Sequence, residues 1–136
     1  MKKILLDTNT YSAHVQGNTE TSAILRDSSI VVYMPVIVVA ELRVGFKSGN
    51  RELENEIILK AFLKKSTILE VNLETTDQYA KIIKSLRLKG RPIPTNDVWI
   101  AALALQHQVP LLTFDAHFQH VDDLRIIQTF ADFQRI

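Results

Sequence analysis

The 136-residue sequence contains no cysteine. This absence excludes a disulfide framework, a zinc site built on thiolates and a cysteine nucleophile, and it fits a reducing compartment. Long apolar runs are also absent. The longest, residues 30–40, has eleven residues and includes a proline, whereas a membrane span needs about 20. We therefore expect a soluble, cytoplasmic protein.

Glycine and proline are scarce, with four of each, too few for a linker-rich or collagen-like chain. Hydrophobic residues make up 46% of the sequence, which excludes wholesale disorder. A chain of this length buries roughly two thirds of the surface that its unfolded form exposes. We expect residues 1–136 to form a single domain.

The formal net charge of +1 gives no indication of a nucleic-acid binder. The basic residues are unevenly distributed, however, because residues 81–91 contain five of them and no acid. A basic stripe of this kind attracts a phosphate backbone. A solvated helix face is the other interpretation, and the pattern alone favours it.

Apolar runs alternate with amphipathic stretches. Strands are predicted at residues 4–6, 30–33, 68–73, 109–114 and 124–129. Helices are predicted at residues 19–27, 38–47, 52–65, 76–89 and 97–107, the last capped by Thr95 or Asn96, with a short tail at 131–135. This alternation predicts an α/β fold, a three-layer domain with about five parallel strands and crossover helices.

Four acidic residues stand out against apolar surroundings. Asp7 and Asp115 each follow an apolar strand, and ligands of open parallel sheets bind beyond the carboxyl ends of the strands. Glu41 follows the apolar run 36–40, and Asp97 opens an apolar helix. A carboxylate in such surroundings is costly to bury unless it is paired or bound to a cation.

Each acid taken singly has a structural explanation: a strand-end turn for Asp7 or Asp115, the helix dipole for Asp97, a surface ion pair for Glu41. Their separations of 34, 56 and 18 residues exclude a common local cause. Clustered carboxylates raise one another's pKa unless a cation intervenes. Oxygen ligands without cysteine point to Mg²⁺ or Mn²⁺.

The segments around these acids resemble the four motifs of PIN-domain ribonucleases, and in particular the VapC-type toxins of type II toxin–antitoxin systems. Order, spacing and total length all agree, and the resemblance extends from Lys3 to about Ile127. The matching segments are Ile4-Leu5-Leu6-Asp7-Thr8-Asn9, Ala40-Glu41-Leu42-Arg43, Pro94-Thr95-Asn96-Asp97-Val98-Trp99-Ile100-Ala101-Ala102 and Leu112-Thr113-Phe114-Asp115.

The resemblance implies a PIN-like domain, with a five-stranded parallel sheet flanked by helices. It implies an acidic pocket that holds one or two Mg²⁺ or Mn²⁺ ions. The implied activity is that of a metal-dependent endoribonuclease, a hydrolase that cleaves phosphodiester bonds of single-stranded or looped RNA. The implied partners are a second copy of the chain, in a homodimer, and a small cognate antitoxin protein.

By match to the family motifs, Asp7 and Asp97 are the main metal ligands, Asp115 completes the metal site, and Glu41 binds a second metal or orients a water. Small polar residues beside them are expected to support the ligands by hydrogen bonds: Thr8, Asn9 and Thr113. Turn and strand-end roles explain these three equally well. The residues expected to contact RNA are Lys84, Arg87, Lys89 and Arg91.

The sequence departs from the family pattern near the last aspartate. Phe114 occupies a position where such toxins often have a basic residue, and His117 stands where another acid is sometimes present. The partners of Asp115 and the substrate contacts therefore stay open. We expect His117 to be exposed, and Trp99, two residues after Asp97, to point away from the pocket.

Three other classes of protein differ in how well they fit the sequence. A phosphoacceptor signalling domain needs adjacent acids after the first strand and a lysine at the end of the last, and the chain has neither. A PIN-type nuclease acting in RNA maturation or on DNA is compatible with the sequence. A non-catalytic PIN-like binding protein fits less well, because a degenerate site usually loses some of its acids.

Overall fold

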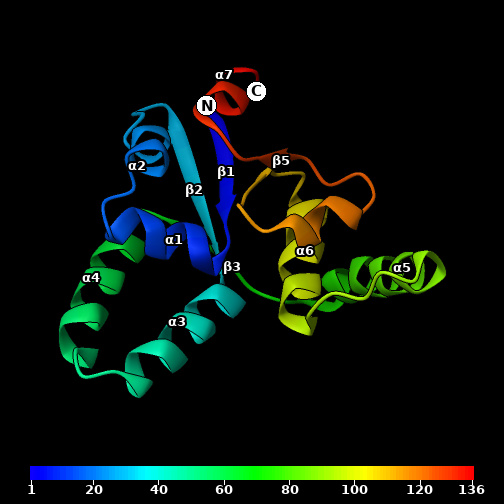
Figure 1. The fold of residues 1–136 in the computed structure, drawn as a ribbon, viewed down its shortest axis with the longest axis horizontal. Coiled ribbons are helices and arrows are strands. Elements are labelled where there is room, and N and C mark those ends of the chain that lie inside the picture. Colours follow the sequence, from blue (N-terminus) through cyan, green and yellow to red (C-terminus); the bar gives the residue numbers. More distant parts are fainter.

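The computed structural model describes all residues 1–136 and contains one five-stranded parallel sheet (Figure 1). The strand order is β3-β2-β1-β4-β5. The strands are β1 (Lys2–Leu6), β2 (Ile30–Pro35), β3 (Thr67–Leu69), β4 (Leu111–Leu112) and β5 (Ile126–Ile127). The predicted α/β fold with a parallel five-stranded sheet is confirmed.

The central strand β1 explains the short apolar segment near the N-terminus. Ile4, Leu5 and Leu6 are fully buried, as expected for a parallel strand covered by helices on both faces. Leu5 pairs with Tyr33 of β2 on one side and with Leu111 of β4 on the other. The residues that follow β1 and β4 therefore emerge side by side at the carboxyl edge of the sheet.

Helices cover both faces of the sheet, with α1 and α2 on one side and α5 and α6 on the other (Figure 1). The helices are α1 (Thr8–Val15), α2 (Thr19–Leu25), α3 (Val36–Ser48), α4 (Glu52–Lys64), α5 (Leu73–Lys89), α6 (Thr95–His107) and α7 (Phe130–Gln134), with a 3₁₀ helix η1 (Ala116–His120). No helix combines the length and the hydropathy that a membrane crossing requires.

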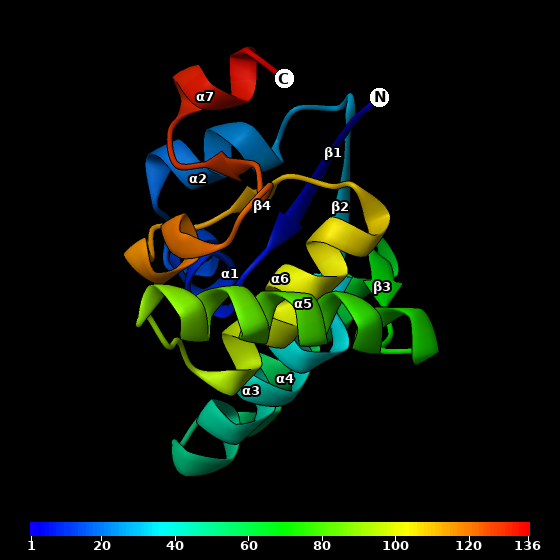
Figure 2. The same ribbon diagram turned by 90° about the vertical axis from the view of Figure 1, so that its right-hand side faces the viewer.

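Two helices form the region beyond the carboxyl edge of the sheet. Helices α3 and α4 pack together and extend away from the strands (Figure 2). Helix α3 also packs against α1 and α6. Its first turns therefore lie beside the residues that leave the ends of β1 and β4.

Helix α6 is the most deeply buried helix of the fold. Val98 and residues 100–104 are all buried in the hydrophobic core. Their exclusion from water anchors the helix against the sheet, since burying a large aliphatic side chain contributes roughly 1.5–3 kcal/mol. Asp97 lies in the first turn of this helix and so has a fixed position relative to the strand ends.

Side-chain caps account for several differences from the predicted boundaries. A capping box between Asn72 and Thr75 starts α5 at Leu73, three residues earlier than predicted. The predicted strand 68–73 is accordingly reduced to β3. Helix α3 begins at Val36 rather than near residue 38, because Pro35 occupies the N-cap position with φ −63°.

One prediction about local structure was wrong, and one helix was not predicted. Neither Thr95 nor Asn96 caps α6, because the N-cap is Pro94, which makes no side-chain hydrogen bond there. Residues 8–15 form α1, a helix that hydrophobic periodicity does not indicate. Asp7 begins it by accepting a hydrogen bond from the Thr10 backbone N–H.

Candidate active site

The structure brings the four acids to one edge of the sheet. Asp7 follows β1 and Asp115 lies just beyond β4, two strands that are neighbours. Glu41 lies on α3 and Asp97 on α6, and these helices pack against each other. Asp7 and Asp97 each interact electrostatically with Asp115, and Asp97 also with Glu41. The acids therefore share one electrostatic field.

Asp7 is the most buried of the four, with 4% of its surface exposed. Its Oδ1 accepts hydrogen bonds from the Thr10 backbone N–H at 2.9 Å and the Thr10 hydroxyl at 2.8 Å. Its Oδ2 accepts a hydrogen bond from the Thr113 hydroxyl. Burial raises the pKa of Asp7, these hydrogen bonds lower it, and the charge of Asp115 raises it further. The carboxylate is thus held in one orientation.

The pKa of Asp97 responds to the negative charges around it. Its pKa is raised to about 6, chiefly by burial, and then by repulsion from Asp115 and Glu41. His117 acts in the opposite direction and lowers the pKa of Asp97. The negative charge of the cluster is therefore only partly compensated by groups of the protein itself.

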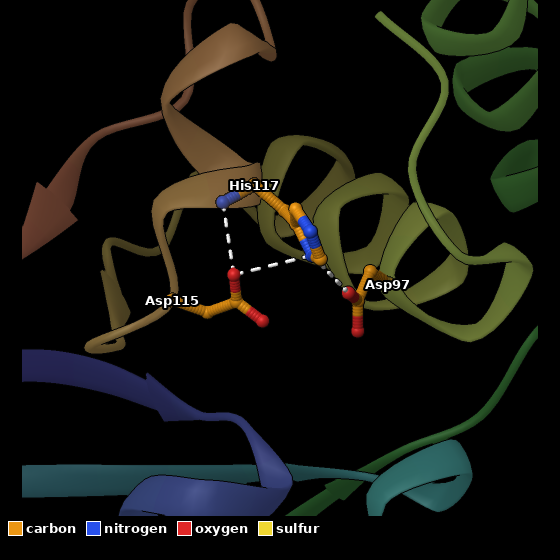
Figure 3. A group of neighbouring side chains, drawn as sticks. All are labelled: Asp97, Asp115 and His117. Atoms are coloured by element: carbon orange, nitrogen blue, oxygen red, sulfur yellow. Dashed lines mark hydrogen bonds and ion pairs between the residues drawn. The ribbon is translucent and has the colours of Figure 1, made fainter.

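Asp115 and His117 form a compact turn after β4. The backbone N–H of Asp115 donates to the Thr113 hydroxyl oxygen at 3.0 Å, and Asp115 Oδ1 accepts from the His117 backbone N–H at 2.9 Å. The imidazole Nδ1 of His117 lies 3.2 Å from Asp115 Oδ1 and 3.6 Å from Asp97 Oδ2 (Figure 3). His117 is exposed, as expected, but its position between two aspartates was not foreseen.

Glu41 is half-buried and is oriented by Thr8. The Thr8 hydroxyl donates a hydrogen bond to Glu41 Oε1 at 2.6 Å. Two of the three small polar residues singled out in the sequence, Thr8 and Thr113, thus contact an acid of the cluster. Asn9 does not: its side chain is exposed and makes no hydrogen bond to the cluster, so its expected supporting role is not seen.

The four basic residues of the predicted RNA-binding stripe have different surroundings. Lys89 is engaged within the protein, because its Nζ donates to Asp122 Oδ1 and, at 2.9 Å, to the His120 carbonyl. Lys84, Arg87 and Arg91 are exposed and form no ion pair in the structure. Three of the four therefore present a free positive charge to solvent.

Trp99 has a structural role. Its ring stacks on Tyr79 of α5 at a centroid distance of 4.0 Å, with 28° between the planes. Helices α5 and α6 pack against each other, and this stack forms part of that contact. This arrangement agrees with the expectation that Trp99 points away from the pocket.

The donor set fits a divalent cation. One ligand atom each from Asp97, Asp115 and His117 lies within 4.8 Å of the others, and Asp7 and Glu41 add carboxylates to the same field. Carboxylate oxygens are preferred ligands of Mg²⁺ and Mn²⁺, and imidazole nitrogen is a ligand for several transition ions. A cation placed here relieves the repulsion that raises the pKa of Asp97.

Sequence reasoning missed two members of this site. Thr10 was missed, although aspartate is a preferred N-cap residue whose carboxylate accepts a hydrogen bond from the backbone N–H two or three residues later. The contacts of His117 were also missed. Its signal was its position two residues after Asp115, where an aspartate side chain regularly accepts a backbone hydrogen bond.

Comparison with known proteins agrees with this geometry. The family model of the PIN domain matches residues 4–124. The chain belongs to the PIN domain family, in which nucleases generally use divalent metal ions.

Similar proteins include a ribonuclease, a toxin and a member of a toxin–antitoxin family. Ribonuclease VapC1 of Rickettsia felis is 31% identical over 129 residues, which cover 91% of this chain and 94% of that protein. Toxin FitB of Neisseria gonorrhoeae is 33% identical over 141 residues, covering 95% and 99%. A crystal structure of VapBC-5, a member of the VapBC family of toxin–antitoxin systems from Mycobacterium tuberculosis, superposes with a TM-score of 0.75 at 26% identity, covering 95% and 100%.

Proposed function

We propose that this protein is a metal-dependent endoribonuclease and the toxin of a toxin–antitoxin pair. The observation that carries the proposal is the convergence of Asp7, Glu41, Asp97 and Asp115, with the pKa of Asp97 raised to about 6 by burial and by its acidic neighbours. Similarity to Ribonuclease VapC1 and Toxin FitB over nearly the full chain supports the reaction and the biological role.

The acids divide into two roles in this proposal. Asp7, Asp97 and Asp115 hold a divalent ion, Mg²⁺ or Mn²⁺, and Glu41 serves a second ion or the attacking water. When bound, the ion supplies Lewis-acid activation of water and charge stabilisation at the phosphate. Hydrogen bonds from Thr10 and Thr113 keep the Asp7 carboxylate aimed at the site.

In this proposal Glu41 is the proton acceptor. Its Oε1 is engaged by the Thr8 hydroxyl, which leaves Oε2 available to take a proton from the attacking water. The water oxygen then bonds to phosphorus and the bond from phosphorus to the 3′-oxygen breaks. The 3′-oxygen leaves with the bonding electron pair and takes a proton from solvent water. Removal of the proton during attack makes the water a better nucleophile.

The basic stripe provides the substrate contacts in this proposal. Lys84 and Arg87 project from α5, and Arg91 follows the helix, all without an ion-pair partner in the protein. Their charges attract the phosphates of an RNA strand. Lys89 contributes less, because contact with RNA would compete with its bond to Asp122.

A protein partner is the second part of the proposal. Leu53 and Ile57 of α4 are 75% and 62% exposed, and Val44 of α3 is 66% exposed. Exposed apolar side chains gathered on two packed helices fit a surface that another protein covers. The proposed occupants of the protein's apolar surfaces are a small cognate antitoxin and a second copy of the chain in a homodimer. Light scattering of the purified protein, with and without the antitoxin, measures both assemblies.

The experiment for the activity is cleavage of a mixed RNA pool by purified protein with Mg²⁺ or Mn²⁺, and again with EDTA. Asp97→Asn is tested beside it, and Asp123→Asn is the matched control, an exposed aspartate outside the cluster. We expect cutting that needs the metal, is lost in Asp97→Asn and persists in Asp123→Asn. Cutting that survives EDTA or Asp97→Asn contradicts the proposal, as does a purified protein that binds no divalent ion.

A further inference from the structure

The imidazole of His117 lies beside the acidic cluster as its nitrogen-bearing neighbour. Its Nδ1 lies 3.2 Å from Asp115 Oδ1 and 3.6 Å from Asp97 Oδ2, so one nitrogen faces two carboxylates at once (Figure 3). The three atoms form the candidate metal-binding group of the structure. A nitrogen donor is therefore built into a site that is otherwise made of oxygen.

The spacing of these atoms is that of ligands around one ion. Metal–ligand distances of about 2.0–2.2 Å place neighbouring donors about 3.0 Å apart in octahedral and about 3.4 Å apart in tetrahedral coordination. The observed separations of 3.2 and 3.6 Å from His117 Nδ1 differ from these values by a few tenths of an ångström. The imidazole and each carboxylate therefore already lie at about the separation that two ligands of one ion require.

The histidine is also held in place, although half of its side chain is exposed. Its backbone N–H donates to Asp115 Oδ1 at 2.9 Å, which fixes the start of η1. The next residue, Phe118, is fully buried in the core. The main chain at residue 117 is therefore anchored from both sides, and the ring needs only its own rotamer to reach the ion.

We propose that His117 is a direct ligand of the catalytic divalent ion through Nδ1, and that it makes the site prefer a transition-metal ion to Mg²⁺. This inference rests on the proposed function, because it takes Asp97 and Asp115 as ligands of the same ion. Imidazole binds first-row transition ions well, whereas Mg²⁺ prefers oxygen ligands and keeps several waters. An oxygen-only site lacks this bias.

A competing explanation assigns the imidazole a different task. On that view His117 compensates the charge of Asp97 and Asp115 only while no ion is bound, and it leaves when the ion arrives. The two explanations predict opposite changes in metal affinity when the imidazole is removed. A ligand that is removed weakens metal binding, whereas removal of a competing cation strengthens it.

The test uses the full chain with Zn²⁺ and Mg²⁺ as the ions, because both are diamagnetic and one favours imidazole. Isothermal titration calorimetry compares wild type with His117→Ala, and His120→Ala is the matched control on the same 3₁₀ helix. Circular dichroism establishes that each variant is folded. We expect His117→Ala to weaken Zn²⁺ binding at least about tenfold and Mg²⁺ binding less than about twofold, with His120→Ala unchanged.

A second variant and a spectroscopic measurement make the result specific. His117→Asp restores an oxygen ligand, so we expect it to recover Mg²⁺ binding while its preference for Zn²⁺ over Mg²⁺ falls below that of wild type. In ¹⁵N spectra of the histidine rings, the Nδ1 resonance that disappears in His117→Ala is expected to shift on Zn²⁺ addition to wild type.

The outcomes separate this inference from the proposed function. Unchanged or tighter Zn²⁺ binding by His117→Ala, or an Nδ1 resonance that does not move, overturns the role of His117 while leaving a metal-dependent nuclease intact. If the wild-type protein binds neither ion, the proposed function itself is overturned. It is also overturned if Asp97→Asn binds both ions as tightly as the wild-type protein does.

Discussion

The hydroxyl of Thr113 donates a hydrogen bond to Oδ2 of Asp7, a residue 106 positions earlier in the chain. Both residues are buried. The same hydroxyl oxygen accepts a hydrogen bond from the backbone N–H of Asp115 at 3.0 Å. One side chain just after β4 thus positions two acids of the cluster, one that follows β4 and one that follows the neighbouring strand β1.

Thr113→Val keeps the shape of the side chain and removes both hydrogen bonds. Because an unpaired buried polar group costs about 1–3 kcal/mol, we expect the free energy of unfolding to fall by about that amount. The loss also raises the pKa of Asp7, since the Thr113 hydroxyl lowers it, and metal binding weakens accordingly. Urea unfolding and metal titration measure the two effects.

The matched variant is Thr113→Ser, which retains the hydroxyl and loses a methyl group. It should bind metal as wild type does, and its loss of stability should come from packing alone. If Thr113→Val binds the ion with unchanged affinity, the hydroxyl does not position the site.

The raised pKa of Asp97, about 6, makes the stability of the metal-free protein depend on pH. Between the unfolded value near 3.8 and about 6, the folded state holds more protons than the unfolded state. Stability from this group therefore falls as the pH rises through that window and stays low above it. Asp97→Asn removes this loss, and we expect it to stabilise the metal-free protein at pH 7.

The gain should be on the order of 1–2 kcal/mol, less than the roughly 3 kcal/mol of a two-unit shift, because solvent screens the charge. Thermal melts in EDTA from pH 4 to pH 7.5 measure it. The melting temperatures of the two proteins should converge at the acid end and separate by a few degrees at pH 7. Parallel curves across the range would show that repulsion at Asp97 does not limit stability.

Thr8 links the first helix to Glu41, and its hydroxyl orients the carboxylate. For Thr8→Val we expect the rate of RNA cleavage to fall about tenfold, the lower end of the effect of removing a partner of a metal-site residue. Both residues are partly exposed, so the free energy of unfolding should change little. Single-turnover cleavage assays measure the rate, and Thr8→Ser should restore it. Full activity in Thr8→Val would show that cleavage does not depend on the orientation that Thr8 gives to Glu41.

The basic stripe should be visible in the salt dependence of RNA binding. Neutralising Lys84 and Arg87 together removes two phosphate contacts, which lowers the magnitude of the salt slope by about 1.4 for a single strand. Binding is measured in the inactive Asp97→Asn background so that the RNA stays intact. Lys64→Ala with Lys65→Ala is the control, since it removes the same charge at the end of α4. An identical slope in the two double variants would mean that α5 does not contact RNA.

The sequence was sufficient for the architecture because apolar runs and helical periodicity are properties of neighbouring residues. Burial of residues 4–6, and of Val98 and residues 100–104 in α6, follows from their composition. The segments around Asp7, Glu41, Asp97 and Asp115 were recognisable for the same reason, since each acid interrupts or ends an apolar stretch. The α/β class and the family followed from these features together.

Apolar patterns do not reveal the features of the fold that depend on side-chain hydrogen bonds. Asp7 looked like a strand-end residue, but it also caps α1, a helix whose apolar pattern is weak. The start of α5 was misplaced because the capping box of Asn72 and Thr75 outweighs the local periodicity. Asn9 appeared equivalent to Thr8 in sequence, yet only Thr8 points at the cluster.

The sequence by itself determined which residues are available for chemistry and the order of strands and helices that carries them. Only the tertiary structure decided that Thr113 reaches Asp7, that Lys89 is engaged by Asp122, and that His117 lies between two aspartates. The physical reason is the distance along the chain over which each effect acts. Periodicity and propensity act over a few neighbouring residues, whereas these contacts join side chains brought together by strand pairing and helix packing.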